Sequence, residues 1–348
     1  MMTIKGWSLA ALLVCGAPPA SLAARPPPDI QFNTIGAPGN AAYPLKSPPG
    51  YVSVQGRGRV DYEYRIGKYE VTTAQWMEFV NTYTVLGGQW QFFADPVRWG
   101  AVPDPAYSGP GIKYKLNPSL TNAGMVGVYG ISWRESAMFA NWLHNEKASG
   151  TWAIENGAYD TSTFTTNPNG TFNDQLTHNP GAKYWIPTFD EHIKAAHYDP
   201  NRYGPGQGGY WMFSHGSDEP AIGGPPGIGQ ANTGFILPAF GNYYIPLGSY
   251  PETQSPWGLL DTAGASSEHT EFWWFPNGPY VERGARGSST GGGADPSDRI
   301  YWVNANSPQF GYSGIGLRIA AAIPSPGSLA LLAMSWTLFG IRKRRRAP

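Results

Sequence analysis

Apolar positions in residues 63–83 predict a strand followed closely by a helix. The stretch EYRIGKYEVTT has β-forming side chains on either side of a turn at Gly67: Tyr64, Ile66, Tyr69 and Val71. Thr72-Thr73 is typical of a helix N-cap. The following residues place four apolar side chains at helical spacing on one face: Trp76, Phe79, Val80 and Tyr83.

Two later segments also have a helical pattern. In ISWRESAMFANWLHNEK, Ser132 precedes Glu135 by three residues, which forms a capping box. Four side chains of this helix are available for packing: Ala137, Ala140, Trp142 and Leu143. The stretch YWIPTFDEHIKAAHYD predicts a third, shorter helix, capped by Thr188.

The remaining segments have no sustained period. Residues 24–60 are rich in Pro and Gly and predict extended chain, whereas residues 84–125 predict a loop. Residues 148–182 predict a long polar loop or insertion. From residue 200 to 330 the pattern predicts turns and short strands without a helix. Helices followed by a long irregular β-rich half favour an α+β fold with little regular secondary structure.

The amino-acid composition indicates that the loops are ordered and packed against a core. The 348 residues include 45 Gly and 33 Pro, yet aromatic residues reach 14%, with 14 Trp. Large aromatic side chains fix loops onto a core, and disordered chains lack them. The length also allows one large domain.

The two ends of the chain have the features of targeting segments. Residues 1–23 combine Lys5, an apolar run from Trp7 to Cys15 and small residues at Ser21-Leu22-Ala23, as in a secretory signal peptide. Residues 323–348 place the apolar run Leu329–Ile341 before a block of basic residues. That run is shorter than the roughly 20 residues that a stable transmembrane helix needs.

The C-terminal segment resembles the PEP-CTERM sorting tail of Gram-negative bacteria. Pro324-Ser325-Pro326 stands where that tail has Pro-Glu-Pro. The resemblance implies that a membrane protease removes the tail during delivery to the cell envelope or the extracellular matrix. The alternative is a permanent C-terminal membrane anchor. Both interpretations predict an exported protein.

The formal net charge of zero conceals an acidic body. Six of the 24 Lys and Arg residues lie in the leader and the tail, whereas all 24 Asp and Glu residues lie between them. The body therefore has 18 basic residues and a net charge of −6. Such a charge gives no electrostatic basis for binding nucleic acid.

Six motifs follow one another between residues 61 and 322: IGKYEVTTAQWMEFVNTY, VGVYGISWRESAMFANWL, YWIPTFDEHIKAAH, GSYPETQSPWGLLDTAGASSEHTEF, VERGARGSS and GIGLRIA. Their order resembles that of the sulfatase-modifying-factor family, the formylglycine-generating-enzyme domain. The resemblance implies a single C-type lectin-like domain, with a short sheet, two flanking helices and much ordered loop.

The same resemblance raises the question of catalysis. Family members that generate formylglycine oxidise a substrate cysteine with O₂ and hold Cu(I) with two cysteines, since soft thiolates select that ion. The resemblance places those cysteines near Gly291 and Pro296, which carry no metal-binding side chain. The only cysteine is Cys15, in the predicted leader. We therefore expect no copper, and the alternative is an oxidase with a different metal site.

The family also binds structural Ca²⁺ through oxygen ligands, so Ca²⁺ is a candidate cofactor. One implied site uses the segment GASSEH, where Glu268 is retained but Ala265 replaces an Asn ligand. The other implied site draws on side chains and carbonyls of four residues: Asn232, Thr233, Asn242 and Tyr244.

Other clusters of polar residues favour structural roles. His192 and His197 are five residues apart, so they cannot face one ion as an i, i+4 pair does, and we interpret them as surface or helix-end residues. Glu268 lies close to Glu271, and a structural or buried role for Glu268 is favoured over acid–base chemistry. The stretch SSTGGGAD lacks the Gly-Lys-Ser/Thr of a phosphate-binding loop, and no G-x-S-x-G occurs.

Late aromatic and amide residues predict a surface that binds a ligand. The candidate residues are Trp273, Trp274, Arg286, Trp302, Asn304 and Asn306, with Tyr312 beyond them. The alternative is that these aromatic residues fill a loop-rich core. The sequence thus predicts an exported, non-catalytic module that binds an extracellular polysaccharide or protein, with an oxidase of the formylglycine-generating type as the alternative.

Overall fold

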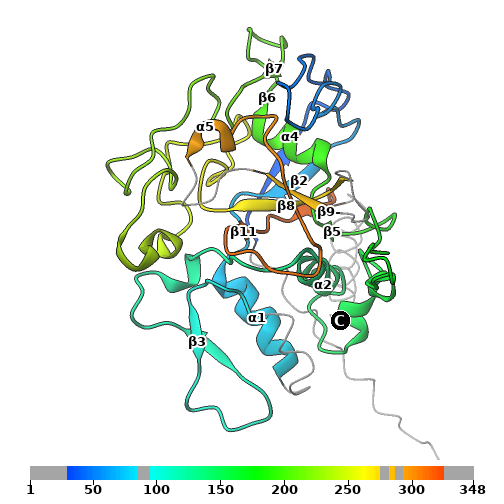
Figure 1. Cartoon of the computed structure of the whole chain (residues 1–348), viewed down its shortest axis with the longest axis vertical. Coiled ribbons are helices and arrows are strands. Elements are labelled where there is room, and N and C mark those ends of the chain that lie inside the picture. Colours follow the sequence, from blue (N-terminus) through cyan, green and yellow to red (C-terminus); the bar gives the residue numbers. More distant parts are fainter. Residues whose placement is uncertain (1–29, 85–94, 275–281, 287–292, 325–348) are drawn as a thin grey trace, which may run out of the picture.

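The computed structural model describes residues 30–84, 95–274, 282–286 and 293–324 (Figure 1). They form short helices and small sheets joined by long turns. The predicted α+β class with little regular secondary structure is confirmed.

The first sheet joins the two ends of the domain. Its spatial order is β1 (Phe32–Ile35), β2 (Tyr64–Gly67), β12 (Ala320–Ala321) and β5 (Tyr184–Trp185), and all pairs are antiparallel. Ala320 lies between Ile66 on one side and Trp185 on the other. The strand predicted over residues 63–73 is shorter than expected, because β2 ends at Gly67.

Three predicted helices and their caps are confirmed. They are α1 (Thr73–Tyr83), α2 (Trp133–His144) and α4 (Phe189–His197). Each begins with a capping box in which the N-cap hydroxyl accepts the N3 amide and the N3 side chain accepts the N-cap amide. The N-cap residues are Thr72, Ser132 and Thr188.

The core between α1 and α2 is an aromatic layer. The Trp76 and Phe139 rings stack with centroids 5.2 Å apart, and those of Phe79 and Trp142 lie 5.4 Å apart. All four side chains are buried. Such pairs contribute about 0.5–1.5 kcal/mol each beyond the burial of their area.

Short elements lie in segments predicted as loops. The hairpin of β3 (Ala101–Pro103) and β4 (Tyr114–Leu116) and the 3₁₀ turn η3 (Ala123–Met125) lie within residues 84–125. Residues 148–182 contain α3 (Trp152–Glu155) and η4 (Thr161–Thr163), beside α2 (Figure 1). The prediction of no helix after residue 200 is wrong for η5 (Pro238–Tyr244) and α5 (Ala294–Ser297). Elements of a few residues leave too little periodicity to recognise.

The second sheet is built from the late part of the chain. Its order is β10 (Asn304–Asn306), β9 (Glu282–Arg286), β8 (Ser267–Trp274) and β11 (Ile315–Gly316), so that β10 is an edge strand. A small hairpin of β6 (Tyr198–Asp199) and β7 (Gly209–Tyr210) follows α4 at one end of the molecule (Figure 1).

Within the described ranges, every helix is too short or too polar to cross a membrane. The predicted signal peptide and most of the predicted tail, including Leu329–Ile341, lie outside the described residues.

Candidate functional site

The second sheet brings most of the predicted ligand-binding residues together. Trp273 on β8 lies opposite Arg283 on β9, and Arg283 lies opposite Asn306 on β10. Residues directly opposite one another share a face of a sheet, so Trp273 and Asn306 lie in one row. Trp274 follows Trp273 on β8, whereas Arg286 and Asn304 lie toward the other end of the sheet, where Arg286 is opposite Glu268. Of the Trp274 and Arg286 side chains the structure describes nothing.

Trp302 lies just before β10 and packs against the N-terminal segment. Its ring centroid is 5.9 Å from that of Tyr51, and Tyr51 in turn contacts Tyr301 at 4.8 Å. Trp302 is therefore partly buried in an aromatic contact. Trp273, in contrast, is exposed at the end of β8.

Beyond β10, the chain lines a groove with the insertion of residues 148–182. A hollow of about 310 Å³ lies between Asn306 and Tyr312 on one side and Phe172 on the other. A larger hollow of about 790 Å³ lies between the start of α2 and residues 154–164. Both hollows share Gln309 and Phe310, and we call them together the Phe310 groove. Phe310 is 58% exposed.

One residue, Arg134 of α2, holds both walls of this groove. Its backbone amide donates to the carbonyl of Pro308 at 3.1 Å, next to Phe310. Its guanidinium donates to both carboxylate oxygens of Asp174 in the insertion, each at 2.8 Å. The guanidinium also lies over the rings of Phe164 and Phe172, at 5.6 and 5.5 Å from their centroids. A two-pronged contact of this kind fixes orientation as well as distance.

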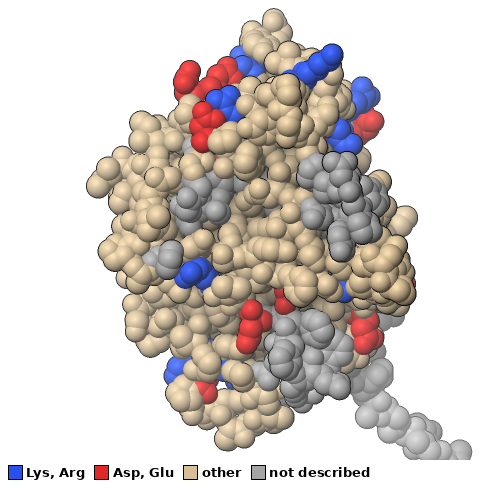
Figure 2. Space-filling model, viewed as in Figure 1, with Lys and Arg blue, Asp and Glu red and all other residues tan. Residues whose placement is uncertain are grey.

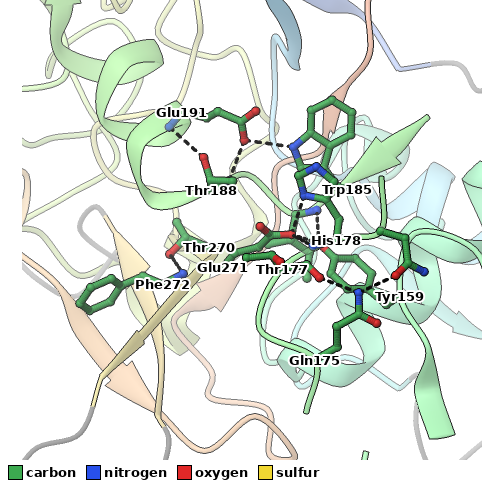
Figure 3. A network of polar contacts seen from close by, with 12 residues as sticks. Tyr159, Gln175, Thr177, His178, Trp185, Thr188, Glu191, Thr270, Glu271 and Phe272 are labelled. Carbon is green, nitrogen blue, oxygen red and sulfur yellow. Dashed lines mark hydrogen bonds and ion pairs between the residues drawn. The ribbon is translucent and has the colours of Figure 1, made fainter. Parts of the chain in front are cut away.

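A second anchor ties the insertion to β8 (Figure 3). The Glu271 carboxylate accepts hydrogen bonds from the Tyr159 hydroxyl at 2.6 Å and the His178 amide at 2.8 Å, and the His178 ring lies 2.9 Å away. The His178 ring also stacks on Trp185, with centroids 4.7 Å apart. Burial opposes the charged imidazole, but the hydrogen bond and attraction to Glu271 prevail and raise the pKa of His178.

The neighbouring Glu191 has a structural role in the same view (Figure 3). It caps α4 by accepting the Thr188 amide at 2.7 Å, and it accepts the Trp185 indole N–H at 3.0 Å and the Tyr62 hydroxyl at 2.9 Å. Burial raises the pKa of Glu191 despite these donors. With its lone pairs occupied, Glu191 serves to position α4 against β5.

A buried ion pair lies behind the second sheet. Arg318, which is 0% exposed, donates to Oε1 of Glu268 at 2.9 and 2.6 Å and to the carbonyls of Gly67, Lys68 and Leu260. Burial would raise the pKa of Glu268, but Arg318 and His192 lower it to about 2. Glu268 therefore stays ionised and joins β8 to the turn after β2. The predicted buried role of Glu268 is confirmed.

The two histidines are not surface residues, so that part of the interpretation is wrong, although His197 does lie at the end of α4. His192 is buried, and its Nε2 lies 2.7 Å from Oε2 of Glu268. His197 is also buried, with Nδ1 3.3 Å from the carbonyl of Trp211. The sequence pattern of α4 did not reveal the burial of these histidines, because their rings contact polar groups on other elements rather than apolar neighbours.

Comparison with protein families decides the identity of the domain. A model of the sulfatase-modifying factor enzyme 1-like domain (FGE-sulfatase) matches residues 53–323. The chain belongs to this family. The predicted resemblance is confirmed. Two of the six motifs supply the buried ion pair, because GIGLRIA contains Arg318 and GSYPETQSPWGLLDTAGASSEHTEF contains Glu268.

Two solved structures, CarF and variable protein 1, agree with this assignment at the level of the fold. The sulfatase-modifying-factor domain is similar to CarF, with 18% identity over 85% of this chain and 100% of CarF, at a TM-score of 0.50. It is also similar to variable protein 1 of Treponema denticola, with 16% identity over 84% and 95%, at a TM-score of 0.50. PvdO from Pseudomonas aeruginosa matches with 14% identity over 83% and 100%, at 0.42. Among curated proteins, none matches the sequence.

The positions of the family's cysteines are only partly described. Gly291 lies outside the described residues, and Pro296 lies in α5. Among the described residues, no group of three or more His, Asp and Glu side chains is arranged to hold a metal ion. Neither position offers a thiolate.

The first implied calcium site does not fit the ion. Both carboxylate oxygens of Glu268 are engaged, one by Arg318 and the other by His192. A guanidinium 2.6 Å from the only retained ligand would repel a second cation. Ala265 contributes no side-chain oxygen.

The second implied calcium site fits better in its donor chemistry. Among the described residues, no hydrogen-bond donor reaches the buried Oδ1 of Asn232, an oxygen of the kind that suits a hard cation. The Asn232 amide donates to the carbonyl of Asn242 at 2.9 Å, and Oδ1 of Asn242 accepts the Leu237 amide. Thr233 is fully buried beside them, and Tyr244 is partly buried. Asn232 would thus be the leading ligand of a bound Ca²⁺.

Sequence reasoning missed Arg134, Asp174 and Phe310. Arg134 lies inside a predicted helix, where nothing distinguishes it from a solvated charge. Asp174 and Phe310 lie in segments without a period. The single available signal was the accumulation of Phe, Asn and Thr in residues 161–175, which is unusual for a purely solvated loop.

Proposed function

We propose that this sulfatase-modifying-factor domain is a non-catalytic binding module, and that it holds an extracellular polysaccharide in the Phe310 groove. The observation that supports it is the groove itself: an exposed Phe ring between two hollows, with polar side chains on both walls. Aromatic rings stack on sugar faces, while amides and hydroxyls both donate to and accept from sugar hydroxyls.

The shape and charge of the groove favour a neutral polymer. The two hollows continue past Phe310, so a chain of several units can cover both. Arg134 is neutralised by Asp174. On the face shown in Figure 2, acidic and basic side chains occur together and most of the surface is uncharged. The other charged residues that line the groove, Glu155 and Asp160, are acidic, so the groove disfavours an anionic ligand.

The cysteine content supports a role without copper. The oxidation of a substrate cysteine in this family requires a pair of thiolates for Cu(I), and Cys15 is the only cysteine of the chain. Export and sorting of the tail by a membrane protease are part of the same proposal. Fractionation of producing cells and mass spectrometry of the C-terminus test them: a cytoplasmic protein would contradict export.

Affinity electrophoresis on neutral polysaccharides, together with a glycan array, tests the proposed ligand. Phe310→Ala and Tyr312→Ala should reduce retention by about tenfold or more, because each removes a ring that would stack on a sugar. Ile228→Ala is the matched control, since Ile228 is 84% exposed and lines neither hollow of the groove. Equal retention of all three variants would overturn the groove as the binding site.

A peptide assay tests the alternative function. The protein is incubated with Cu(I) or Fe(II), O₂ and a Cys-containing sulfatase peptide, and O₂ uptake and peptide mass are measured. Conversion of the thiol to an aldehyde would contradict the non-catalytic proposal. An unchanged peptide, with retention on a polysaccharide, supports it.

Calcium binding at Asn232 is a separate part of the proposal. Added Ca²⁺ should raise the melting temperature, because an ion that binds only the folded state stabilises it, by about 2.7 kcal/mol at one hundred times Kd. Asn232→Ala should abolish that response. A response that survives in Asn232→Ala would place the ion elsewhere.

A further inference from the structure

A second pocket lies at the other end of the domain, beside the β6–β7 hairpin. Its volume is about 350 Å³, at the lower end of the range of small-molecule sites. The walls are residues 41–45 of the N-terminal segment and residues of the stretch from Tyr198 to Asp218. None of its described lining residues also lines the Phe310 groove.

Tyrosine rings form the inner wall of this tyrosine pocket. Tyr210 packs edge-on against Tyr43 and Tyr198, with centroids 5.5 and 5.0 Å apart. All three are buried. A Cβ at Gly208 would lie 2.0 Å from the Tyr198 hydroxyl, so only glycine allows this ring its position. The three rings thus pack into one wall without a ligand.

Two hydroxyl groups of this wall are available to a ligand. The Tyr210 hydroxyl accepts from the Asn40 amide and donates to the carbonyl of Ala41, both at 2.8 Å. The hydroxyls of Tyr43 and Tyr198 form no hydrogen bond within the described part of the protein, although both residues line the pocket. A phenol both donates and accepts, as sugar hydroxyls do.

The charged residues of the pocket neutralise each other. Arg202 donates to Asp218 at 2.6 Å, and its guanidinium lies over the rings of Tyr203 and Trp211, at 5.1 and 4.4 Å from their centroids. Arg202 thus occupies the aromatic faces that a cationic ligand would need. Asp218 also accepts the Met212 amide at 3.1 Å, which fixes its orientation at the rim.

We propose that the tyrosine pocket binds a single neutral sugar ring. Tyr203, which is 66% exposed, provides the ring that stacks on the sugar through the face that Arg202 does not cover, and Leu45 also lines the pocket. The Tyr43 and Tyr198 hydroxyls and Asp218 meet the sugar hydroxyls. The Asp218 carboxylate would repel an anionic ligand, and the Arg202 guanidinium beside it would repel a cationic one. This site does not depend on the groove, and it binds the end or a free unit of a saccharide rather than a polymer chain.

Saturation-transfer difference NMR with free monosaccharides tests this site. The probes are glucose, galactose and N-acetylglucosamine, with choline as the cationic and glucuronate as the anionic comparison. We expect a neutral sugar to bind with millimolar affinity, and Tyr203→Ala and Asp218→Asn to weaken it by about tenfold. Both side chains are exposed enough to be replaced without unfolding the protein.

Two matched variants make the result specific to the pocket. Tyr203→Phe keeps the ring and should retain binding, and Ile228→Ala, an exposed position that lines neither the pocket nor the groove, should leave monosaccharide binding unchanged. Loss of monosaccharide binding in Phe310→Ala would assign the signal to the groove. Absence of any neutral-sugar signal, or stronger binding of choline or glucuronate, would overturn the proposal even if the groove retains its polysaccharide.

Discussion

The aromatic layer between α1 and α2 and the insertion of residues 148–182 are held by different forces. In the aromatic layer, buried rings such as those of Trp76 and Phe139 stack on one another. The insertion has only the short α3 and η4 and relies on amide and hydroxyl hydrogen bonds, with two ionic anchors at Asp174 and His178. Apolar packing is insensitive to direction, whereas hydrogen bonds and ion pairs require each partner to be placed.

This difference suits the two regions to different tasks. The layer determines whether the domain folds, because its loss removes a large share of the apolar burial. The insertion determines the shape of the groove, because its contacts place Phe164 and Phe172 against Arg134. Substitutions in the two regions should therefore separate stability from binding.

The largest effect should follow Trp76→Ala in the aromatic layer. Removing a fully buried Trp leaves a cavity and should destabilise the domain by about 3–5 kcal/mol. Urea unfolding monitored by circular dichroism measures this loss. A loss below about 1 kcal/mol would show that the layer is not the dominant source of stability.

A smaller and more local effect should follow Asp174→Asn in the insertion. It weakens a buried two-pronged contact to Arg134 and should cost about 1.5–3 kcal/mol, with a larger proportional loss of polysaccharide retention. The matched control is Asp61→Asn, where an exposed pair with Arg59 should contribute only about 0–1 kcal/mol. If both variants retain full binding, the anchor does not shape the groove.

The loss of a single hydrogen-bonded turn should destabilise the domain less than the loss of the Asp174 contact. The Asn167 side chain donates to Thr171 at 2.7 Å and to Asn173 at 2.8 Å. Asn167→Ala should destabilise by about 0.5–1.5 kcal/mol and should speed proteolysis within the insertion. Cleavage by a protease at limiting concentration, mapped by mass spectrometry, locates the change. Cleavage that speeds up equally throughout the chain would contradict a local role.

The smallest effect should be a pH dependence of the second anchor. The unfolded His titrates near pH 6.5, and the pKa of His178 is raised in the folded protein. The ion pair with Glu271 therefore stabilises fully below about pH 6.5, and its contribution is lost as pH rises through the folded pKa. The free energy of unfolding of the native protein should fall with pH relative to that of His178→Asn. Parallel pH profiles would rule out this anchor as the titrating group.

The contrast also explains what could be predicted from the sequence. The helices and their caps could be predicted because Trp76 and Phe79, like Ser132 and Glu135, are close in sequence and follow local rules. The family could be predicted from the order of motifs. The groove could not be predicted, because Arg134, Asp174 and Pro308 are far apart in the sequence and come into contact only in the folded protein. No local sequence pattern indicates such a contact. The burial of His192 could not be predicted for the same reason, since its partner Glu268 lies on another element.

The pairing of β12 with β2 has a consequence for how the domain is made. Chain synthesis proceeds from the N-terminus, so β1 and β2 are made long before Ala320 and Ala321, which supply the strand between β2 and β5. Until then the edge of β2 is an unpaired template, and contacts between distant parts of a chain form slowly. The fold can therefore be completed only after nearly the whole domain has been synthesised. A chain interrupted before Arg318 would lack both the closing strand and the cation that neutralises Glu268.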